Sequence, residues 1–220
     1  MTDSTVPRRS FLTHLAVGSA ALTAACSGGP AASSAAMASA DEMDQWFGAM
    51  NNTNKVIYDC AAPTAGPNGV MFARNFIKFS EEQLDTTDAD NSVVVCFRHF
   101  ATPFAYNDAM WAKYPGIAVT LSINDPKTMK PATRNFLLHD AILGEAGADL
   151  PSVTAHGVQF AVCGAATTFI AKLLAGTTGD AAAIDADLSA NLIPGSKMAP
   201  AGVVAVQRAQ KAGFAYTFAG

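Results

Sequence analysis

The sequence predicts an α/β fold with a mostly parallel sheet of about five strands. Two observations lead to this class. Short apolar segments rich in β-branched residues alternate along the chain with longer segments whose apolar residues recur at helical spacing. One short segment, residues 92–97, is apolar at almost every position, which is typical of a strand covered by helices on both faces. Strands that alternate with helices in this way form parallel sheets through right-handed crossovers.

The first half of the domain is expected to contain two strands and one long helix. Residues 54–60 are an apolar run with polar borders and are predicted as the first strand. Residues 63–69 contain two prolines and two glycines and are predicted as a loop. Apolar residues at helical spacing then predict a helix over 70–84. An acidic turn over 85–91 leads into the strand at 92–97.

The middle of the chain is expected to hold an insertion near 115–151. A short helix is predicted over 106–114, after which the pattern weakens, and residues 136–143 are predicted as one more helix. An excursion of this length is usually a functional lid or an oligomer contact. Asp125 and Arg134 are candidate ligand-binding residues there, although turn chemistry explains the Asn-Asp-Pro sequence around Asp125 equally well.

The next strand delivers one cysteine to the first turn of a helix. Residues 158–162 alternate in the manner of a strand, and from residue 165 the apolar period becomes helical and stops at Gly176. A thiol at this junction, Cys163, meets the unpaired N–H groups of the helix, which favour the nucleophilic thiolate. Cys163 is therefore the leading candidate for a reactive residue, and a small apolar cysteine in the core is the alternative.

The remaining elements complete the alternation. A short helix is predicted within 177–192 and a fourth strand within 192–198. Residues 200–213 start with a proline and end with a glycine, as helices commonly do. Residues 214–218 are predicted as the last strand.

Residues 1–40 are expected to lie outside the fold as a leader and an Ala/Ser-rich linker. Arg8 and Arg9, followed by Ser-Phe-Leu and an apolar run, resemble a twin-arginine export signal. Small residues before Cys26 resemble a lipoprotein processing site, although Thr23 stands where Leu is usual. Lipidation of Cys26 and simple cleavage both remain open. We expect a periplasmic or otherwise extracytoplasmic protein that touches the membrane only through a lipid on Cys26.

Composition narrows the class of function. Residues 41–220 are enough for a single domain, and the net charge of the chain is −4. A basic stripe is missing from the sequence, so nucleic-acid binding is not expected. We find no C-x-x-C, H-E-x-x-H or phosphate-loop motif, and we expect neither a metal nor a cofactor. Cys60, Cys96 and Cys163 are odd in number and each lies at or inside an apolar strand, so a disulfide scaffold is not expected, while a Cys60–Cys96 bridge remains open.

Residues 54–220 resemble the DsrE/DsrF/TusD group of sulfur-relay proteins, including its small YchN-like members. The resemblance rests on the strand-to-helix junction at Cys163, on the strand that ends in Arg98-His99, and on a C-terminal run. That run leads from Pro200-Ala-Gly through a helix and Gln-x-x-Gly to Tyr216. We can place no counterpart of the 115–151 insertion in the family, and those relatives are cytoplasmic, whereas this chain is expected to be exported.

The resemblance implies a flavodoxin-like three-layer fold and a homo-oligomer, often a trimer or hexamer. It also implies that Cys163 carries sulfane sulfur as a persulfide and exchanges it with a thiol or sulfane-sulfur donor and acceptor.

Other site candidates surround Cys163. His99 follows a buried strand at its carboxyl end and is a candidate proton donor or thiolate partner, the alternative being a histidine satisfied by the backbone. Arg98 is a candidate for an anionic ligand or for a structural ion pair. Gly164 and Thr167, in the first turn of the helix, are further binding candidates. His156 precedes the strand and is expected at the far end of the sheet.

Two functions are compatible with these residues. The first is a sulfur carrier that uses Cys163. The second is a non-catalytic oligomeric binding or assembly module in which Cys163 is inert. A thiol–disulfide oxidoreductase is the weakest reading because the C-x-x-C pair is missing.

Overall fold

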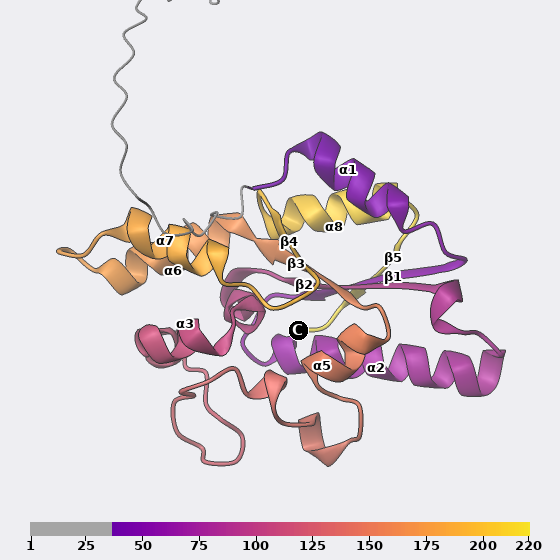
Figure 1. Ribbon diagram of the computed structural model, residues 1–220, viewed down its shortest axis with the longest axis horizontal. Coiled ribbons are helices and arrows are strands. Elements are labelled where there is room, and N and C mark those ends of the chain that lie inside the picture. Colours follow the sequence, from indigo (N-terminus) through magenta and orange to yellow (C-terminus); the bar gives the residue numbers. More distant parts are fainter. Residues whose placement is uncertain (1–36) are drawn as a thin grey trace, which may run out of the picture. The chain divides into compact units, whose positions relative to one another are not determined.

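The computed structural model describes residues 37–220 (Figure 1). It confirms the predicted α/β class: five parallel strands form one sheet in the order β4-β3-β2-β1-β5, consistent with a flavodoxin-like three-layer fold. The strands are β1 (Asn54–Cys60), β2 (Asn91–Phe97), β3 (Gln159–Cys163), β4 (Ser196–Ala199) and β5 (Ala215–Phe218).

Helices cover both faces of the sheet. In Figure 1, α1 and α8 lie on one side and α2 and α5 on the other. The α-helices are α1 (Ala40–Ala49), α2 (Ala65–Leu84), α3 (Asp108–Lys113), α4 (Gly116–Thr120), α5 (Leu150–Ala155), α6 (Gly164–Ala175), α7 (Ala181–Ala190) and α8 (Gly202–Lys211). Short 3-10 helices span Asp88–Asp90, His99–Ala105, Phe136–Leu138 and Ile142–Gly144.

The handedness of the crossovers explains this distribution. From β1 to β4 each new strand is added on the same side of the one before it, so right-handed connections place α2, α5 and α6 on one face. The connection from β4 to β5 runs back across the whole sheet, and α8 therefore lies on the opposite face. The segments that follow β3 and β4 thus leave the sheet toward opposite faces.

Alternate side chains of the strands fill two cores. Val95, Phe97 and Phe160 face α2 and α6, and the Phe97 and Phe160 rings stack with centroids 5.7 Å apart. Cys96 and Ala161 are paired in register and face α1 and α8. Both cores are lined by apolar side chains, which explains why the central strands lack the polar alternation of a half-exposed sheet.

The predicted loop at 63–69 is wrong, because α2 begins at Ala65. Pro67 lies in the first turn, where a helix tolerates proline. The two glycines serve close packing: a Cβ on Gly66 would lie 2.2 Å from the Phe104 ring, and one on Gly69 would lie 2.2 Å from Cys60 Sγ. Glycines that indicated a turn are thus sites of close helix contact.

The single helix predicted at 136–143 is also wrong. Two short 3-10 helices replace it, and Leu143 has a positive φ of 54° that no α-helix accommodates. The other predicted strands and helices are confirmed within a few residues of their predicted ends.

Helix α1 was not predicted. Ser39 and Glu42 form a capping box at its start, and Phe47 packs edge-on against Phe214 with centroids 5.4 Å apart. Just before the helix, the Ala38 N–H donates to the Met198 carbonyl at 3.0 Å. The folded part of the chain therefore includes residues a little ahead of position 41.

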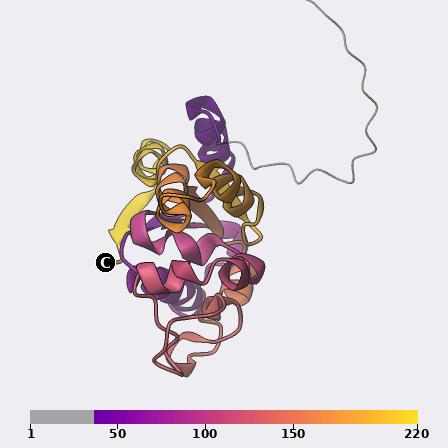
Figure 2. The same ribbon diagram turned by 90° about the vertical axis from the view of Figure 1, so that its left-hand side faces the viewer.

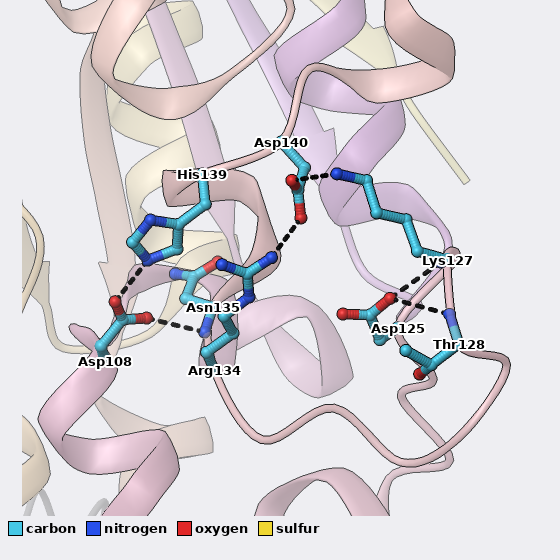
Figure 3. A network of polar contacts seen from close by, with 8 residues as sticks. All are labelled: Asp108, Asp125, Lys127, Thr128, Arg134, Asn135, His139 and Asp140. Atoms are coloured by element: carbon cyan, nitrogen blue, oxygen red, sulfur yellow. Dashed lines mark hydrogen bonds and ion pairs between the residues drawn. The ribbon is translucent and has the colours of Figure 1, made fainter.

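The excursion after α3 packs on the side of the sheet away from α1 (Figure 2). Figure 3 shows the polar contacts that hold it. Asp108 accepts a hydrogen bond from the Asn135 backbone and contacts His139, while Asp140 pairs with Lys127 and Arg134. Within residues 37–220, no helix is both long enough and apolar enough to cross a membrane.

Candidate functional site at the carboxyl edge of β3 and β4

The ends of β3 and β4 form the topological switch point of the sheet. The chain leaves β3 into α6 on one face and leaves β4 into α8 on the other. Open parallel sheets bind ligands in the crevice at such a point, outside the carboxyl ends of the strands. Cys163 is the last residue of β3, and Ala199, its partner in register, is the last residue of β4. The strand order therefore places the candidate thiol at the expected location of a site.

Cys163 is the N-cap of α6. Its backbone is extended, with φ −82° and ψ 104°, and its Sγ accepts a hydrogen bond from the Ala166 N–H at 3.3 Å. The predicted position at the start of the helix is confirmed. The residue is 7% exposed and is therefore buried, although not completely. A donated N–H and the positive end of a helix both stabilise negative charge on the sulfur.

The start of α8 lies beside the start of α6. The Ala165 N–H, in the first turn of α6, donates to the Pro200 carbonyl at 3.0 Å, two residues before α8 begins at Gly202. Ala201 caps α8 without a side-chain hydrogen bond. Two helix N-termini, each of which attracts anions, thus adjoin at the end of β3.

Arg98 follows the last residue of β2. Phe97 pairs with Val162 in register, so Arg98 and Cys163 each come directly after a residue of the last pair between these two neighbouring strands, and Arg98 is on the same face of the sheet as Cys96. Its guanidinium donates two hydrogen bonds to the Asp59 carboxylate, one from Nε and one from Nη2, the latter at 2.9 Å. The structural ion pair is therefore present. Among the described residues Nη1 makes no hydrogen bond, and this group remains available to an anion.

Asp59 was missed in the sequence. It is 2% exposed and accepts a further hydrogen bond from the Tyr216 hydroxyl at 2.9 Å. The hydrogen bond to Asp59 raises the pKa of Arg98, and burial, followed by the bond to Asp59, raises the pKa of Tyr216. A carboxylate inside an apolar strand could have been recognised in the sequence as a site of interest, because a buried carboxylate needs a hydrogen-bonding or charged partner. Its partners, however, lie far away along the chain.

Gly202 lets α8 start against this arginine. A Cβ at this position would lie 2.3 Å from Arg98 Cβ and 3.0 Å from Cδ. The Gly202 carbonyl is also 3.7 Å from Cys96 Sγ, within reach of the thiol proton. The glycine of the Pro-x-Gly sequence therefore allows α8 to approach β2.

His99 lies at the same edge but is not joined to the thiol. It has a positive φ of 51°, is exposed, and stacks on Phe100 with ring centroids 3.9 Å apart. No hydrogen bond links it to Cys163 among the described residues. A role of His99 as proton donor stays a prediction.

Gly164 and Thr167 are enclosed by packing. A Cβ on Gly164 would lie 2.6 Å from Met37 Sδ and 2.9 Å from the Ala199 carbonyl oxygen. Thr167 is fully buried; its hydroxyl donates to the Cys163 carbonyl at 3.1 Å and accepts from the Tyr106 hydroxyl at 3.0 Å. Thr167 therefore holds the strand-to-helix junction in place.

The other two thiols are buried and free. Cys60 faces the α2 side of the sheet and Cys96 the α8 side, so they point away from each other and are not bridged. Burial raises the pKa of both thiols above the ordinary value. In register Cys96 lies opposite Ala161, one full pleat before Cys163.

The remaining candidates lie elsewhere. Arg8, Arg9 and Cys26 fall outside the described residues. Asp125 accepts backbone hydrogen bonds from Lys127 and Thr128 and so builds its own turn, as Figure 3 shows. Among residues 37–220 no group of three His, Cys, Asp or Glu side chains is placed to hold a metal ion.

Comparison with protein-family models, with curated proteins and with solved structures finds no match for this chain. The DsrE-like resemblance therefore stays a prediction from the sequence.

Proposed function

We propose that this protein is an exported, DsrE-like carrier that accepts and hands on sulfane sulfur as a persulfide on Cys163. The observation that carries the proposal is the position of this thiol. It caps α6 at the switch point of the sheet, receives the Ala166 N–H, and ends β3 at the edge where Arg98 follows the neighbouring strand β2. The proposal includes export by the twin-arginine route and a homo-oligomeric assembly.

The chemistry needs no external oxidant. The Cys163 thiolate, its proton lost to solvent, attacks the outer sulfur of a persulfide or thiosulfate donor. A new S–S bond forms to Sγ, the S–S bond inside the donor breaks, and its electron pair leaves with the donor as a thiolate or sulfite. An acceptor thiolate then attacks the outer sulfur and releases the Cys163 thiolate.

The residues around the sulfur suit this exchange. A persulfide is anionic, and the Ala166 N–H together with the starts of α6 and α8 supplies positive electrostatic potential. The free Nη1 of Arg98 suits an anionic donor, because Nε and Nη2 are held by Asp59 and fix the guanidinium in position.

One observation favours the alternative of a non-catalytic module. Cys163 is only 7% exposed, and Met37 packs over the neighbouring Gly164. In this alternative the Cys163 thiol only fills space at the end of β3, and the protein functions by binding partners or ligands at its surface.

Intact-mass analysis separates the two functions. The reduced protein is incubated with polysulfide or thiosulfate, and the adduct is located by peptide mapping. The carrier predicts one added sulfur on the peptide that contains Cys163, which is lost with Cys163→Ser and discharged by a small thiol. Cys96→Ser is the control and should keep the adduct. A protein that acquires no sulfur at Cys163 while remaining folded would support the non-catalytic module instead.

A further inference from the structure

A cavity of about 460 Å³ opens at the amino-terminal edge of the sheet, at the opposite end of β3 from Cys163. It lies between the end of α1, the starts of β2 and β3, and the end of α5. Its volume is in the range of small-molecule sites. Because of this separation, the cavity is independent of the thiol chemistry proposed above.

Ser92 provides the first indication of a ligand. This residue of β2 lines the cavity and is 5% exposed, yet its hydroxyl has no hydrogen-bond partner among the described residues. A buried hydroxyl without a partner costs roughly 1–3 kcal/mol. The hydroxyl oxygen has almost no accessible surface, so a polar atom in the cavity would satisfy it once a change of the Ser92 rotamer turns the hydroxyl toward the cavity.

The other polar groups of the cavity are held in fixed orientations. Gln159 accepts the Trp46 indole N–H through Oε1 at 2.7 Å, which leaves its amide NH₂ as a free donor. Asn52 donates through Nδ2 to the Asn91 carbonyl at 2.9 Å, which leaves its amide oxygen as a free acceptor. With the Ser92 hydroxyl, the cavity thus offers a donor, an acceptor and a group that does both.

The charges restrict the class of ligand. Asp88 and His156 form a pair at 3.0 Å on the rim, and neither lysine nor arginine lines the cavity. An anion such as phosphate would face the Asp88 carboxylate with neither lysine nor arginine in the lining to balance it. An ammonium ion only donates and would leave the Gln159 NH₂ group unmatched. A hydroxyl group both donates and accepts, and therefore matches every polar group of the lining.

We propose that this cavity binds a small neutral polyol or monosaccharide, whose hydroxyl groups contact Ser92, Gln159 and Asn52.

The two tryptophans allow a direct test. Trp46 donates to Gln159 at the cavity, whereas Trp111 is buried and donates to the Pro103 carbonyl at 3.1 Å. In ¹⁵N-labelled protein each indole N–H gives its own resonance. Titration with myo-inositol, glucose, galactose and mannose should shift the Trp46 resonance in a saturable manner with at least one of them and leave that of Trp111 in place.

A matched pair of variants checks the role of Ser92. Ser92→Ala should weaken binding about fivefold, as expected for one lost hydrogen bond. Ser196→Ala removes another buried, unpartnered hydroxyl, which lies on β4 outside the cavity, and should leave binding unchanged. Cys163→Ser should also leave it unchanged, so failure here and failure of sulfur transfer are distinguishable.

Three outcomes would overturn the proposal. One is the absence of any Trp46 shift in the wild-type protein with all four compounds. Another is tighter binding of inorganic phosphate or putrescine than of the polyols. The third is equal weakening by Ser92→Ala and Ser196→Ala, which would place the effect outside the cavity.

Discussion

The buried Asp59 carboxylate fixes how the neighbouring arginine can act. Removing a carboxylate from water costs several kcal/mol unless partners replace the lost hydration. Two guanidinium nitrogens of Arg98 and the Tyr216 hydroxyl provide this replacement. Arg98 cannot turn toward a ligand without giving up both of its hydrogen bonds to Asp59, so an anion bound by Arg98 would contact Nη1, which makes no hydrogen bond among the described residues.

Another single residue beside Arg98 gives a stability prediction: Gly202→Ala should destabilise the protein by about 1–3 kcal/mol. The new methyl group would lie 2.3 Å from Arg98 Cβ, an atom close to the backbone that cannot rotate away. Gly48→Ala in α1 is the control. A Cβ there meets nothing within 4 Å, and alanine favours the helix, so this change should be neutral or stabilising. Urea unfolding measures both. Equal stability of Gly202→Ala and the wild type would refute the close approach of α8 to Arg98.

Among the elements, the excursion between α3 and α5 combines buried apolar side chains with a set of polar contacts. Asp140 binds Lys127 and Arg134, while Asp108 binds the Asn135 backbone and His139 (Figure 3). Asn135 is fully buried and donates to the Phe104 and Tyr106 carbonyls. This one side chain ties the excursion to the segment that follows β2.

The Asp140 contacts predict a pH-dependent contribution to stability. The hydrogen bond from Lys127, and then the charges of Arg134 and Lys127, hold the pKa of Asp140 below its ordinary value. A lowered pKa stabilises the fold above the unfolded value of about 3.9, and this stability is lost as the pH falls through the folded pKa. Asp140→Asn should therefore cost about 0.5–1 kcal/mol at pH 7, and this cost should shrink as the pH falls below the unfolded value.

Urea unfolding of wild type and Asp140→Asn at pH 7, 5 and 3 measures this difference. Since Lys127 and Arg134 are 65% and 42% exposed, molar salt should reduce the difference at pH 7. A difference that stays constant from pH 7 to pH 3 would mean that the carboxylate charge is not what Asp140 contributes.

The elements that the sequence predicts well are those specified locally. The strands at 54–60 and 92–97 are apolar runs, and the change from strand to helix at Cys163 occurs within a few residues. Gly66 and Gly69 misled the prediction because the need for close packing with Phe104 and Cys60 arises only in three dimensions.

The site was predictable in part for the same reason. Cys163 and Arg98 stand at the ends of recognisable strands, whereas the link between Asp59 and Tyr216 spans 157 residues. The Ser39–Glu42 capping box before α1 was readable in the sequence and was overlooked. The cavity at Ser92 could not be predicted, because it depends on how α1 and α5 end relative to the sheet.

At the scale of the whole molecule, alkylation of the three cysteines between residues 37 and 220 should measure the unfolding of the domain. Burial raises the pKa of Cys60 and Cys96, so both remain protonated and unreactive in the folded protein at pH 8. Iodoacetamide should therefore modify Cys163 alone among residues 37–220, and all three thiols in concentrated urea.

Peptide mapping after timed labelling measures each site separately. Cys60 and Cys96 lie in different cores, on opposite faces of the sheet. Equal labelling rates for the two at intermediate urea would mean that both cores open together. Labelling of Cys96 in the native protein as fast as in urea would contradict the buried environment described for it.

The pairing of β1 with β5 has a consequence for biosynthesis. These neighbours in the sheet come from opposite ends of the domain, so their contact has a very high sequence separation and forms slowly. While the ribosome still holds the last strand, the outer edge of β1 is open to pairing with other chains. Under the proposed twin-arginine route, which carries folded proteins, a nascent chain would become competent for translocation only after β5 has emerged.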